Sequence, residues 1–328
     1  MSAADASTAS SPHTPAICVI VVAYNAGRHL AACIASLQRQ RWTDFEAIIV
    51  DNGSADGSIE ALGPLPVPFR LLPLGANLGF AAANNRGAAA SRSPWIALLN
   101  PDAVAAPDWL ERLMAAARRH PEFVMFGSTQ IQLADETRWD GLGDVYHASG
   151  IPWRGGFGQR VTGAAPEGEV FGPCAAAALY RRDAFEAAGG FDERFFCYFE
   201  DVDLCFRLRL AGERIVFAPR AVVRHVGSAS TGRTSDFAVY HGTRNRVFTF
   251  VKDMPALLWP LALPCFVLVQ LYLLWRSRRL AVFSPTWRGM RDGFAGAGRF
   301  FAGRPGGKAS LARTLEIARM LSWSPLAL

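Results

Sequence analysis

Apolar runs separated by helical periods constrain the fold of this chain more than any other feature. Residues 17–23 (ICVIVVA) and 45–50 (FEAIIV) are rich in β-branched side chains, which is typical of strands buried on both faces. Between them, residues 28–40 place Leu30, Ile34 and Leu37 on one helical face. Strand, helix and strand at this spacing predict βαβ units and a largely parallel sheet, and hence an α/β fold.

Further elements are predicted along the chain. Strands are expected at 70–73 and 95–99, helices at 183–188 and 201–210, and short strands at 215–218 and 221–223. Between residues 135 and 172, Gly, Trp, Arg and acidic residues alternate without a period. This stretch is too long for a simple connection, so we expect it to form part of a binding surface.

Composition and charge exclude several classes of protein. A chain that is 51% hydrophobic and 19% charged is not disordered. Its six cysteines form no CxxC pair and are interpreted as small buried thiols in a reducing compartment. From Arg276 onward there are ten basic and two acidic residues, whereas the preceding part holds 24 basic and 26 acidic ones. This division disfavours a nucleic-acid partner and favours a C-terminal segment that faces anionic lipid.

The two ends of the chain differ from its middle. Residues 1–15 are small and polar, lack the apolar segment of a signal peptide, and are predicted to be disordered. Residues 256–275 contain no charge and, as a helix, would reach ~30 Å, about the thickness of the hydrocarbon layer. Pro260, Pro264 and Gln270 disfavour a straight spanning helix. We therefore expect one globular domain at 16–250 and a membrane-associated helical region at 251–328.

Polar clusters follow two of the predicted strands. Residues 51–54 (DNGS) come after the second strand, and residues 100–102 (NPD) come after the strand at 95–99. Because ligands bind at the carboxyl edge of an open α/β sheet, we expect these clusters to converge on one crevice. Asp51 suits a ribose hydroxyl or a base edge, and Asp102 suits a divalent cation. Each cluster is also a common turn sequence, so neither is decisive alone.

A third cluster places three carboxylates among aromatic residues at 195–203. Such surroundings raise the pKa of a carboxyl group, which suits a general base. Acidic residues also stabilise helix N-termini, and Asp203 is four residues before Arg207. We interpret Asp203 as structural and the Glu200–Asp201 pair as functional. The fourth candidate is His225, which follows the short strand at 221–223.

In combination these clusters resemble the inverting family 2 glycosyltransferases with the GT-A fold, in particular the bacterial rhamnosyltransferase-like branch. The resemblance runs from about Ile17 to about Pro255. Eight motifs occur in the order of that family: VAYN at 22–25, VDNGS at 50–54, NLGF at 77–80 with NNRG at 84–87, LNPD at 99–102, GGFD at 189–192, YFEDVDLC at 198–205, His225, and YHGTRN at 240–245.

The resemblance implies a fold and a set of site residues. The fold would be a Rossmann-like, mixed and mostly parallel sheet flanked by helices. The nucleotide-binding and donor-binding positions of the family fall on Tyr24, Asn25, Asp51, Asn52, Asn77, Gly79, Asn85 and Asn100. Asn100 replaces the first acid of the metal-binding motif, so Asp102 and His225 would hold Mg²⁺ or Mn²⁺. Glu200 and Asp201 match the catalytic acidic pair of the family, in which Asp201 would be the general base.

The expected activity is inverting transfer of a sugar, with rhamnose from dTDP-rhamnose as the best candidate. The acceptor would be a hydroxyl of a saccharide or of a polyprenyl-diphosphate-linked saccharide, in the synthesis of cell-envelope polysaccharide. Two alternatives remain open: a transferase of the same family that uses another UDP or GDP sugar, and a non-catalytic membrane-associated protein that binds nucleotide sugars. A dinucleotide-dependent oxidoreductase is disfavoured because GxGxxG does not follow the first strand.

This resemblance also bears on the apolar segment at 256–275. A donor that is made in the cytosol requires a cytosolic catalytic domain. A single span would then carry the basic tail to the far side of the membrane, against the positive-inside tendency. We therefore expect a peripheral or monotopic protein at the cytoplasmic face of a bacterial plasma membrane, ahead of a single span or a soluble core helix.

Overall fold

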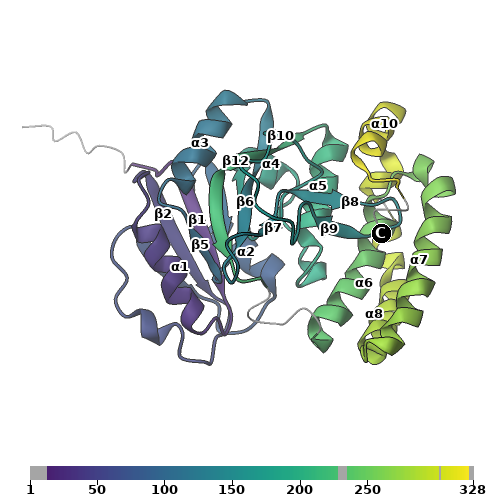
Figure 1. The fold of residues 1–328 in the computed structure, drawn as a ribbon, viewed down its shortest axis with the longest axis horizontal. Coiled ribbons are helices and arrows are strands. Elements are labelled where there is room, and N and C mark those ends of the chain that lie inside the picture. Colours follow the sequence, from purple (N-terminus) through teal and green to yellow (C-terminus); the bar gives the residue numbers. More distant parts are fainter. Residues whose placement is uncertain (1–12, 228–234, 303, 325–328) are drawn as a thin grey trace, which may run out of the picture.

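The computed structural model describes residues 13–227, 235–302 and 304–324, and it combines one large sheet, helices on both of its faces, and a layer of C-terminal helices (Figure 1). Most of the segment predicted to be disordered, residues 1–12, lies outside the described residues. The helices are α1 (Arg28–Gln38), α2 (Phe80–Ala89), α3 (Trp109–Arg119), α4 (Arg182–Ala187), α5 (Glu200–Ala211), α6 (Asp236–Asp253), α7 (Trp259–Arg279), α8 (Phe283–Gly296), α9 (Gly298–Phe301) and α10 (Leu311–Met320).

The strands follow a mixed topology. They are β1 (Ile17–Ala23), β2 (Phe45–Asp51), β3 (Phe69–Pro73), β4 (Trp95–Leu99), β5 (Ala103–Ala105), β6 (Phe123–Gln132), β7 (Trp139–Gly141), β8 (Asp144–Tyr146), β9 (Pro152–Arg154), β10 (Gly168–Glu169), β11 (Ala177–Arg181) and β12 (Arg214–His225). The main sheet has the order β10-β12-β6-β11-β4-β1-β2-β3. Along this order, β10 and β11 run antiparallel to the other six strands, and β5 and β7 add short antiparallel strands beside β12 and β6. The six parallel strands are the majority, which confirms the expected mixed, mostly parallel sheet.

Side chains of β1 alternate between two hydrophobic clusters, one on each face of the sheet. Ile20 belongs to the cluster that includes residues of α2, α4 and α5. Val19 and Val21 belong to the other cluster, which includes residues of α1 and α3. Because successive side chains of a strand point to opposite faces, a strand covered on both sides must be apolar throughout. This two-sided burial explains the continuous apolar runs of the sequence.

Two differences from the predicted elements concern this layer. The stretches at 215–218 and 221–223 are one strand, β12, with a register shift between Ala218 and Val222. Pro219 lies at this irregularity, and its carbonyl accepts a hydrogen bond from Thr129 Oγ1 at 2.9 Å, so the proline interrupts pairing without ending the strand.

The elements α2, α3 and β6 were not predicted. In α2, alanine, asparagine and glycine give little contrast between the two faces.

The C-terminal helices pack on the α/β layer as well as on one another. The expected domain boundary at residue 250 falls within α6. Helix α8 lies so close to α6 that a Cβ at Gly289 would come within 2.6 Å of the Tyr240 carbonyl oxygen. In α7, Ala262, Phe266 and Gln270 are buried and form an inward stripe. Phe266 stacks on Phe250 of α6 at 4.1 Å between ring centroids, which fixes one face of α7 against the protein.

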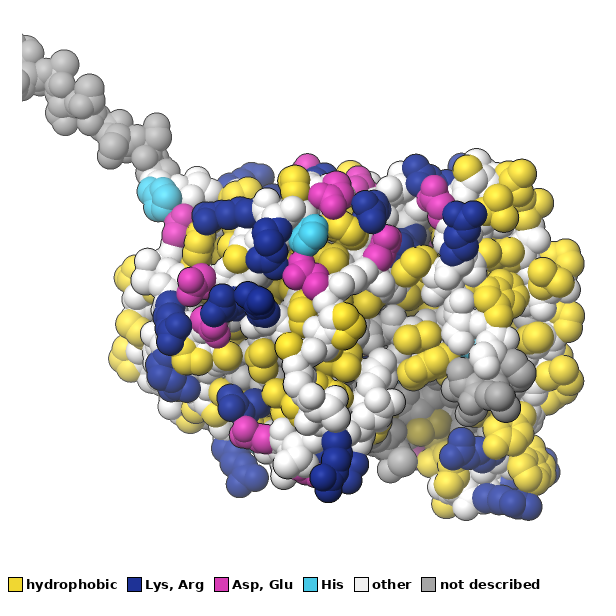
Figure 2. All heavy atoms as spheres, turned by 45° about the horizontal axis from the view of Figure 1, so that its top comes forward, with side chains coloured by type: hydrophobic (Ala, Val, Ile, Leu, Met, Phe, Trp, Pro, Cys, Tyr) yellow, Lys and Arg dark blue, Asp and Glu magenta, His cyan; other side chains and the backbone are white. Residues whose placement is uncertain are grey.

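The opposite face of α7 is exposed and apolar. Leu261 and Leu268 are 64% and 67% exposed. Figure 2 shows hydrophobic side chains gathered along the edge of the molecule that the C-terminal helices form. Within the described residues, one helical segment, Ala256–Arg279, is long and apolar enough to cross a membrane by length and composition, with a mean hydropathy of 2.1. Only 22% of its most apolar 18-residue stretch is buried, whereas the core helix of a soluble domain is mostly buried.

Candidate active site

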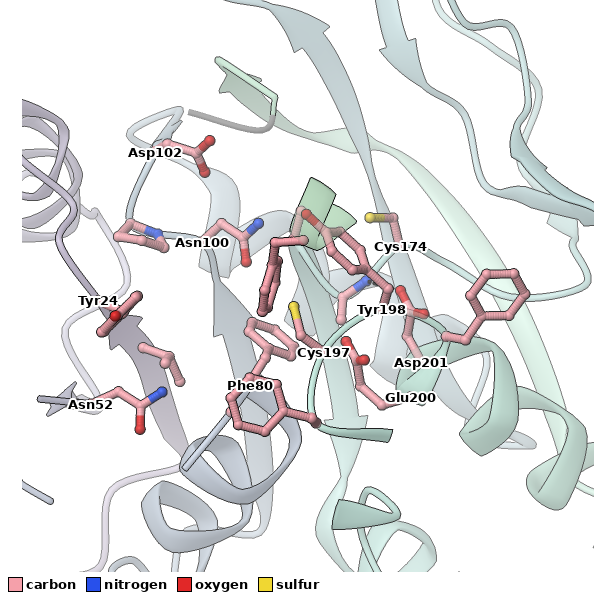
Figure 3. A pocket seen from close by; sticks show the side chains of 18 of the residues that line it. Tyr24, Asn52, Phe80, Asn100, Asp102, Cys174, Cys197, Tyr198, Glu200 and Asp201 are labelled. Carbon is pink, nitrogen blue, oxygen red and sulfur yellow. Dashed lines mark hydrogen bonds between the residues drawn. The ribbon is translucent and has the colours of Figure 1, made fainter. Parts of the chain in front are cut away.

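A cavity of about 480 Å³ opens at the carboxyl edge of the sheet, where the predicted site residues converge (Figure 3). Residues from most of the polar clusters line it, namely Tyr24, Asn52, Asn77, Gly79, Asn100, Asp102, Glu200, Asp201 and His225. Asn25, Asp51 and Asn85 are not among the described residues that line it. The parallel strands bring these clusters together because their carboxyl ends share one edge.

At one end of the cavity, Asn52 connects two loops. Its Oδ1 accepts a hydrogen bond from the backbone N–H of Leu78 at 2.9 Å, and its Nδ2 donates to Asn77 Oδ1 at 3.0 Å. Gly79 has a φ of +87°, and a Cβ there would lie 2.5 Å from the carbonyl oxygen of Phe196. A side chain at position 79 would therefore separate this loop from the loop that leads into α5.

Asn25, Asp51 and Asn85, the predicted residues that do not line the cavity, form hydrogen bonds with the backbone around it. Asn25 Oδ1 accepts from the N–H of Ala55, and Asp51 Oδ1 accepts from the N–H of Ser54, both at 2.9 Å. The Asn85 amide exchanges two hydrogen bonds with the backbone of Phe191, at 2.8 and 2.9 Å. These contacts stabilise the loops that shape the cavity, and the predicted contacts of the three side chains with a nucleotide sugar stay predictions.

A histidine between two carboxylates forms a second corner of the cavity. His225 ends β12 and pairs with Ala103 of β5, which places the imidazole beside Asp102. Its Nε2 lies 3.2 Å from Asp102 Oδ1, and its Nδ1 lies 2.8 Å from Asp140 Oδ2. Burial by itself lowers the pKa of His225, but the hydrogen bonds to Asp102 and Asp140 outweigh it and raise the pKa above its ordinary value.

The residues of this corner fit a divalent cation. Asp102 supplies a hard carboxylate oxygen, and His225 supplies an imidazole nitrogen beside it. Asp140 is placed to accept a hydrogen bond from Nδ1–H, which would leave Nε2 as the nitrogen available to a metal. Metal-binding histidines are usually oriented in this way by a second carboxylate or carbonyl group.

The acidic pair at 200–201 opens α5 at the far side of the cavity. Asp201 Oδ1 accepts from the N–H of Val202 at 2.8 Å, and its Oδ2 accepts from the N–H of Ala175 at 3.1 Å. Burial raises the pKa of Asp201, and these hydrogen bonds oppose that effect. The side chain is therefore held in one orientation by the backbone and is a stronger proton acceptor than an exposed aspartate.

Glu200 has a different environment from Asp201. It is 4% exposed, and its Oε2 has no hydrogen-bond partner among the described residues. Burial and then the charge of Asp201 raise the pKa of Glu200 well above its ordinary value. The preceding loop keeps Phe196, Tyr198 and Phe199 at positive φ, which is costly for residues other than glycine and is common at functional sites.

Asn245 of α6 holds that loop in place. Its Nδ2 donates to the carbonyl oxygens of Phe195, Cys197 and Tyr198 at 2.7 to 2.9 Å. These contacts satisfy backbone groups that the left-handed conformation leaves outside regular secondary structure. The C-terminal helices therefore take part in positioning the acidic pair.

Sequence reasoning did not single out Asp140 or Arg154. Asp140 lies on β7, and Arg154 lies on β9, both within the irregular stretch at 135–172. Arg154 forms an ion pair with Asp140 and also interacts electrostatically with Asp144 and Asp201. It therefore connects the histidine corner with the acidic pair. The absence of a hydrophobic period was the only sequence signal for this region.

The family becomes clear from comparison with known sequences. The sequence model of the family described as "Glycosyl transferase family 2" matches residues 18–189. This chain belongs to glycosyl transferase family 2. A relative from Mycobacterium tuberculosis, named N-acetylglucosaminyl-diphospho-decaprenol L-rhamnosyltransferase, is 33% identical over 274 residues. That alignment covers 75% of this chain and 87% of the relative, which confirms the resemblance to the rhamnosyltransferase-like branch.

Solved structures of glycosyltransferases share the fold. The mannosyltransferase PcManGT from Pyrobaculum calidifontis, solved in complex with GDP-Man and Mn²⁺, is 18% identical with a TM-score of 0.53, and the match covers 88% of each chain. GalNAc-T7 with UDP, GalNAc and Mn²⁺ is 13% identical with a TM-score of 0.59, and the match covers 74% of this chain and 48% of the other. At these identities the likeness concerns the fold, and it confirms the GT-A-like architecture of this family 2 glycosyltransferase.

Proposed function

We propose that this glycosyltransferase is a metal-dependent inverting enzyme that transfers rhamnose from dTDP-rhamnose to a lipid-linked saccharide. One observation carries the proposal: the cavity that Tyr24 and Asn52 line also contains the Asp102–His225 corner and the Asp201 carboxylate. A nucleotide and a cation could thus bind in the same cavity as the carboxylate that would accept the proton. The rhamnosyl group and the lipid-linked acceptor are suggested by the printed name of the Mycobacterium tuberculosis relative.

The donor would bind with its diphosphate toward Asp102 and His225. A cation held by these two side chains supplies charge stabilisation for the departing nucleoside diphosphate. Asp140 orients His225 through Nδ1, and Tyr24 lies at the end of β1, where it would contact the nucleotide. The Asn100 backbone N–H donates to the Ala176 carbonyl at 2.8 Å and so fixes the loop that carries Asp102.

Asp201 would accept the proton of the acceptor hydroxyl as its oxygen attacks the anomeric carbon. The backbone hydrogen bonds from Val202 and Ala175 leave the carboxylate in one orientation toward the cavity. A single displacement needs one base and no protein nucleophile, and its product has the inverted anomeric configuration. Glu200 lies buried beside Asp201, and burial together with the charge of Asp201 raises the pKa of Glu200, so a second full negative charge is disfavoured in this corner.

The acceptor is proposed to come from a membrane surface. The exposed apolar face of α7 is followed by Arg276, Arg278 and Arg279, a pattern suited to anionic headgroups. Phe266 on the other face packs into the core cluster of the protein. A helix that crosses a bilayer alone is surrounded by lipid, so this one-sided packing favours a peripheral or monotopic arrangement at the cytoplasmic face.

A donor screen tests the proposal. The full-length protein would be incubated with the short-chain acceptor decyl-diphospho-N-acetylglucosamine, Mg²⁺ or Mn²⁺, and dTDP-rhamnose or several UDP and GDP sugars. We expect transfer from dTDP-rhamnose, loss of transfer in excess EDTA, and an inverted anomeric configuration by NMR. Transfer that persists in EDTA would contradict the metal role, and a preference for another donor would contradict the rhamnosyl assignment.

A further inference from the structure

A second hollow of about 320 Å³ adjoins the donor cavity. The two share Arg154, Tyr198, Phe199 and Asp201 in their walls. The carboxylate that would accept the proton therefore borders both spaces. In a single displacement the acceptor hydroxyl must reach this carboxylate while the donor occupies the first cavity, so a space that meets the donor cavity at Asp201 is where an acceptor has to lie.

Apart from Val202 of α5, the remaining wall residues of the second hollow come from the β8–β9 hairpin and from α6, which sequence reasoning did not connect. The hairpin of β8 and β9 contributes Asp144, Pro152 and Trp153, and α6 contributes Ala238 and Gly242. Trp153 is half-buried, so part of its indole is available to a ligand. An aromatic face beside carboxyl and guanidinium groups suits a pyranose ring, which presents C–H groups on its faces and hydroxyls at its edge.

Gly242 is the most informative residue of this wall. It lies within α6, where glycine is about 1 kcal/mol less favourable than alanine. At Gly289 and Gly293 of α8, a Cβ would come within 3.0 Å of backbone atoms of α6, so close packing explains those glycines. A Cβ at Gly242 would meet no atom of the described residues within 4 Å. Packing among the described residues thus does not explain Gly242, and a helical glycine that faces a hollow leaves room for a ligand.

The same hairpin contacts α7. Past β8, a Cβ at Gly150 would lie 2.8 Å from the ring of Phe266 in α7, so the turn of the hairpin is in close contact with that helix. β8 and β9 form a separate two-stranded sheet, which Figure 1 shows between the main sheet and α6 and α7. The hairpin that lines the second hollow is therefore also packed against the inward face of α7.

We propose that the hollow between the β8–β9 hairpin and α6 is the acceptor subsite, in which the terminal pyranose of the acceptor packs on Trp153 and over Gly242. This inference rests on the proposed transferase function and adds the place of the acceptor and the residues that determine its fit. Trp153 supplies the platform for the ring. Gly242 keeps the floor open, and Asp201 lies at the junction with the donor cavity.

Larger side chains at Gly242, which fill the hollow, test the acceptor subsite. Gly242→Ala and Gly242→Leu add increasing volume where the helix has space, so both variants should fold. We expect the KM for decyl-diphospho-N-acetylglucosamine to rise in that order, by roughly 10-fold or more for leucine. The dissociation constant for dTDP should stay unchanged. Trp153→Ala should raise the same KM roughly 3- to 10-fold, and Trp153→Phe should restore most of the loss.

Gly298→Leu is the matched control, because Gly298 is an exposed helical glycine of α9 that also has no neighbour within 4 Å of a Cβ. Its KM should equal that of the wild type. An unchanged acceptor KM in Gly242→Leu, or a parallel loss of dTDP binding, would overturn the assignment.

A binding measurement separates this inference from the proposed function. Saturation-transfer NMR with the same acceptor analogue, without donor, should show contact of the pyranose protons with the wild type and loss of that contact in Gly242→Leu. If the wild type transfers no sugar, the proposed function fails, and this binding result still decides the subsite. Decyl diphosphate, which lacks the sugar, should bind both proteins equally. Weaker binding of decyl diphosphate to Gly242→Leu would assign the hollow to the lipid phosphate and contradict the pyranose assignment.

Discussion

Asp201 and Glu200, the two adjacent acids of the candidate active site, differ in the number of backbone hydrogen bonds that their carboxyl groups accept. Asp201 receives hydrogen bonds from two N–H groups, whereas Glu200 is buried with one carboxyl oxygen unpartnered among the described residues. Backbone N–H donors stabilise the charged form of a carboxyl group, and burial without donors favours its neutral form. Two neighbours of similar chemistry are thus suited to different roles, because the charged form is better stabilised at Asp201 than at Glu200.

Replacing each acid by its amide separates these roles. Asp201→Asn removes the proton acceptor, so we expect kcat to fall by roughly 10²-fold or more, with donor binding retained. Glu200→Gln keeps the shape of a side chain that takes no proton from the acceptor, and it should cost much less. Steady-state kinetics with calorimetric titration of dTDP measure both effects. A larger loss in Glu200→Gln than in Asp201→Asn would reverse the assignment.

Asp140 provides a second test on the scale of single residues. It orients His225 through Nδ1 and lies 1% exposed between that imidazole and Arg154. Asp140→Asn should lower the affinity for Mn²⁺ by roughly 10- to 100-fold, as is typical for a residue that orients a metal ligand. Titration of Mn²⁺ by electron paramagnetic resonance in the presence of dTDP measures this change. Saturating Mn²⁺ should restore most of the activity, and an unchanged affinity would remove Asp140 from this role.

Among the elements, α6 links the other C-terminal helices to the α/β layer. Lys252 near its end donates to Asp192 Oδ2 at 2.7 Å and forms an ion pair with the fully buried Asp203 of α5. The predicted pairing of Asp203 with Arg207 is confirmed at 2.7 Å. Because buried charges are costly without partners, these ion pairs determine how α5 and α6 meet, and with them the position of the acidic pair.

Removing the lysine should therefore destabilise the protein strongly. Lys252→Met leaves Asp203 and Asp192 with fewer cationic partners, and we expect a loss of about 3 kcal/mol in the free energy of unfolding. Urea denaturation followed by circular dichroism measures it. Lys308→Met, at an exposed lysine, should change the stability by less than about 0.5 kcal/mol. Equal stabilities of the two variants would mean that the Lys252 ion pairs contribute little.

On the scale of the whole molecule, the C-terminal helices have two different surfaces. One surface packs on the α/β layer, where Phe300 of α9 meets Phe195 at 5.9 Å between ring centroids. The other surface exposes leucines of α7. Truncation of the chain at Asp253 would therefore remove core contacts together with the apolar face. Substitutions confined to the exposed face test membrane binding more cleanly.

The triple variant Leu261→Gln, Leu268→Gln and Leu271→Gln changes only side chains that are at least 57% exposed. It should fold like the wild type while losing most of its affinity for vesicles of phosphatidylglycerol and phosphatidylcholine. Because each buried leucine contributes about 2 kcal/mol, partitioning should fall by roughly 10²-fold or more. Cosedimentation with vesicles measures the bound fraction. Equal binding of both proteins would assign attachment to the basic residues alone, and the absence of wild-type binding would contradict the membrane proposal.

Local sequence determined the buried strands and the polar clusters at their ends. β1 and β4 have the predicted bounds, and most of the predicted site residues line one cavity. These features are predictable because a strand buried on both faces must be apolar along its whole length. The parallel topology then places consecutive strand ends at one edge of the sheet. The order of the motifs was also sufficient to indicate family 2.

Tertiary structure alone decided the partners across the chain. Asp140 and His225 are 85 residues apart, and they meet because β7 and β12 both pair with β6. Trp153 and Gly242 face one hollow because the β8–β9 hairpin lies beside α6. Neither pairing leaves a periodic signal, since periodicity reports which face of an element is buried and not what lies against it. The residues that contact the proposed metal ligand and shape the proposed acceptor subsite were therefore visible only in the folded protein.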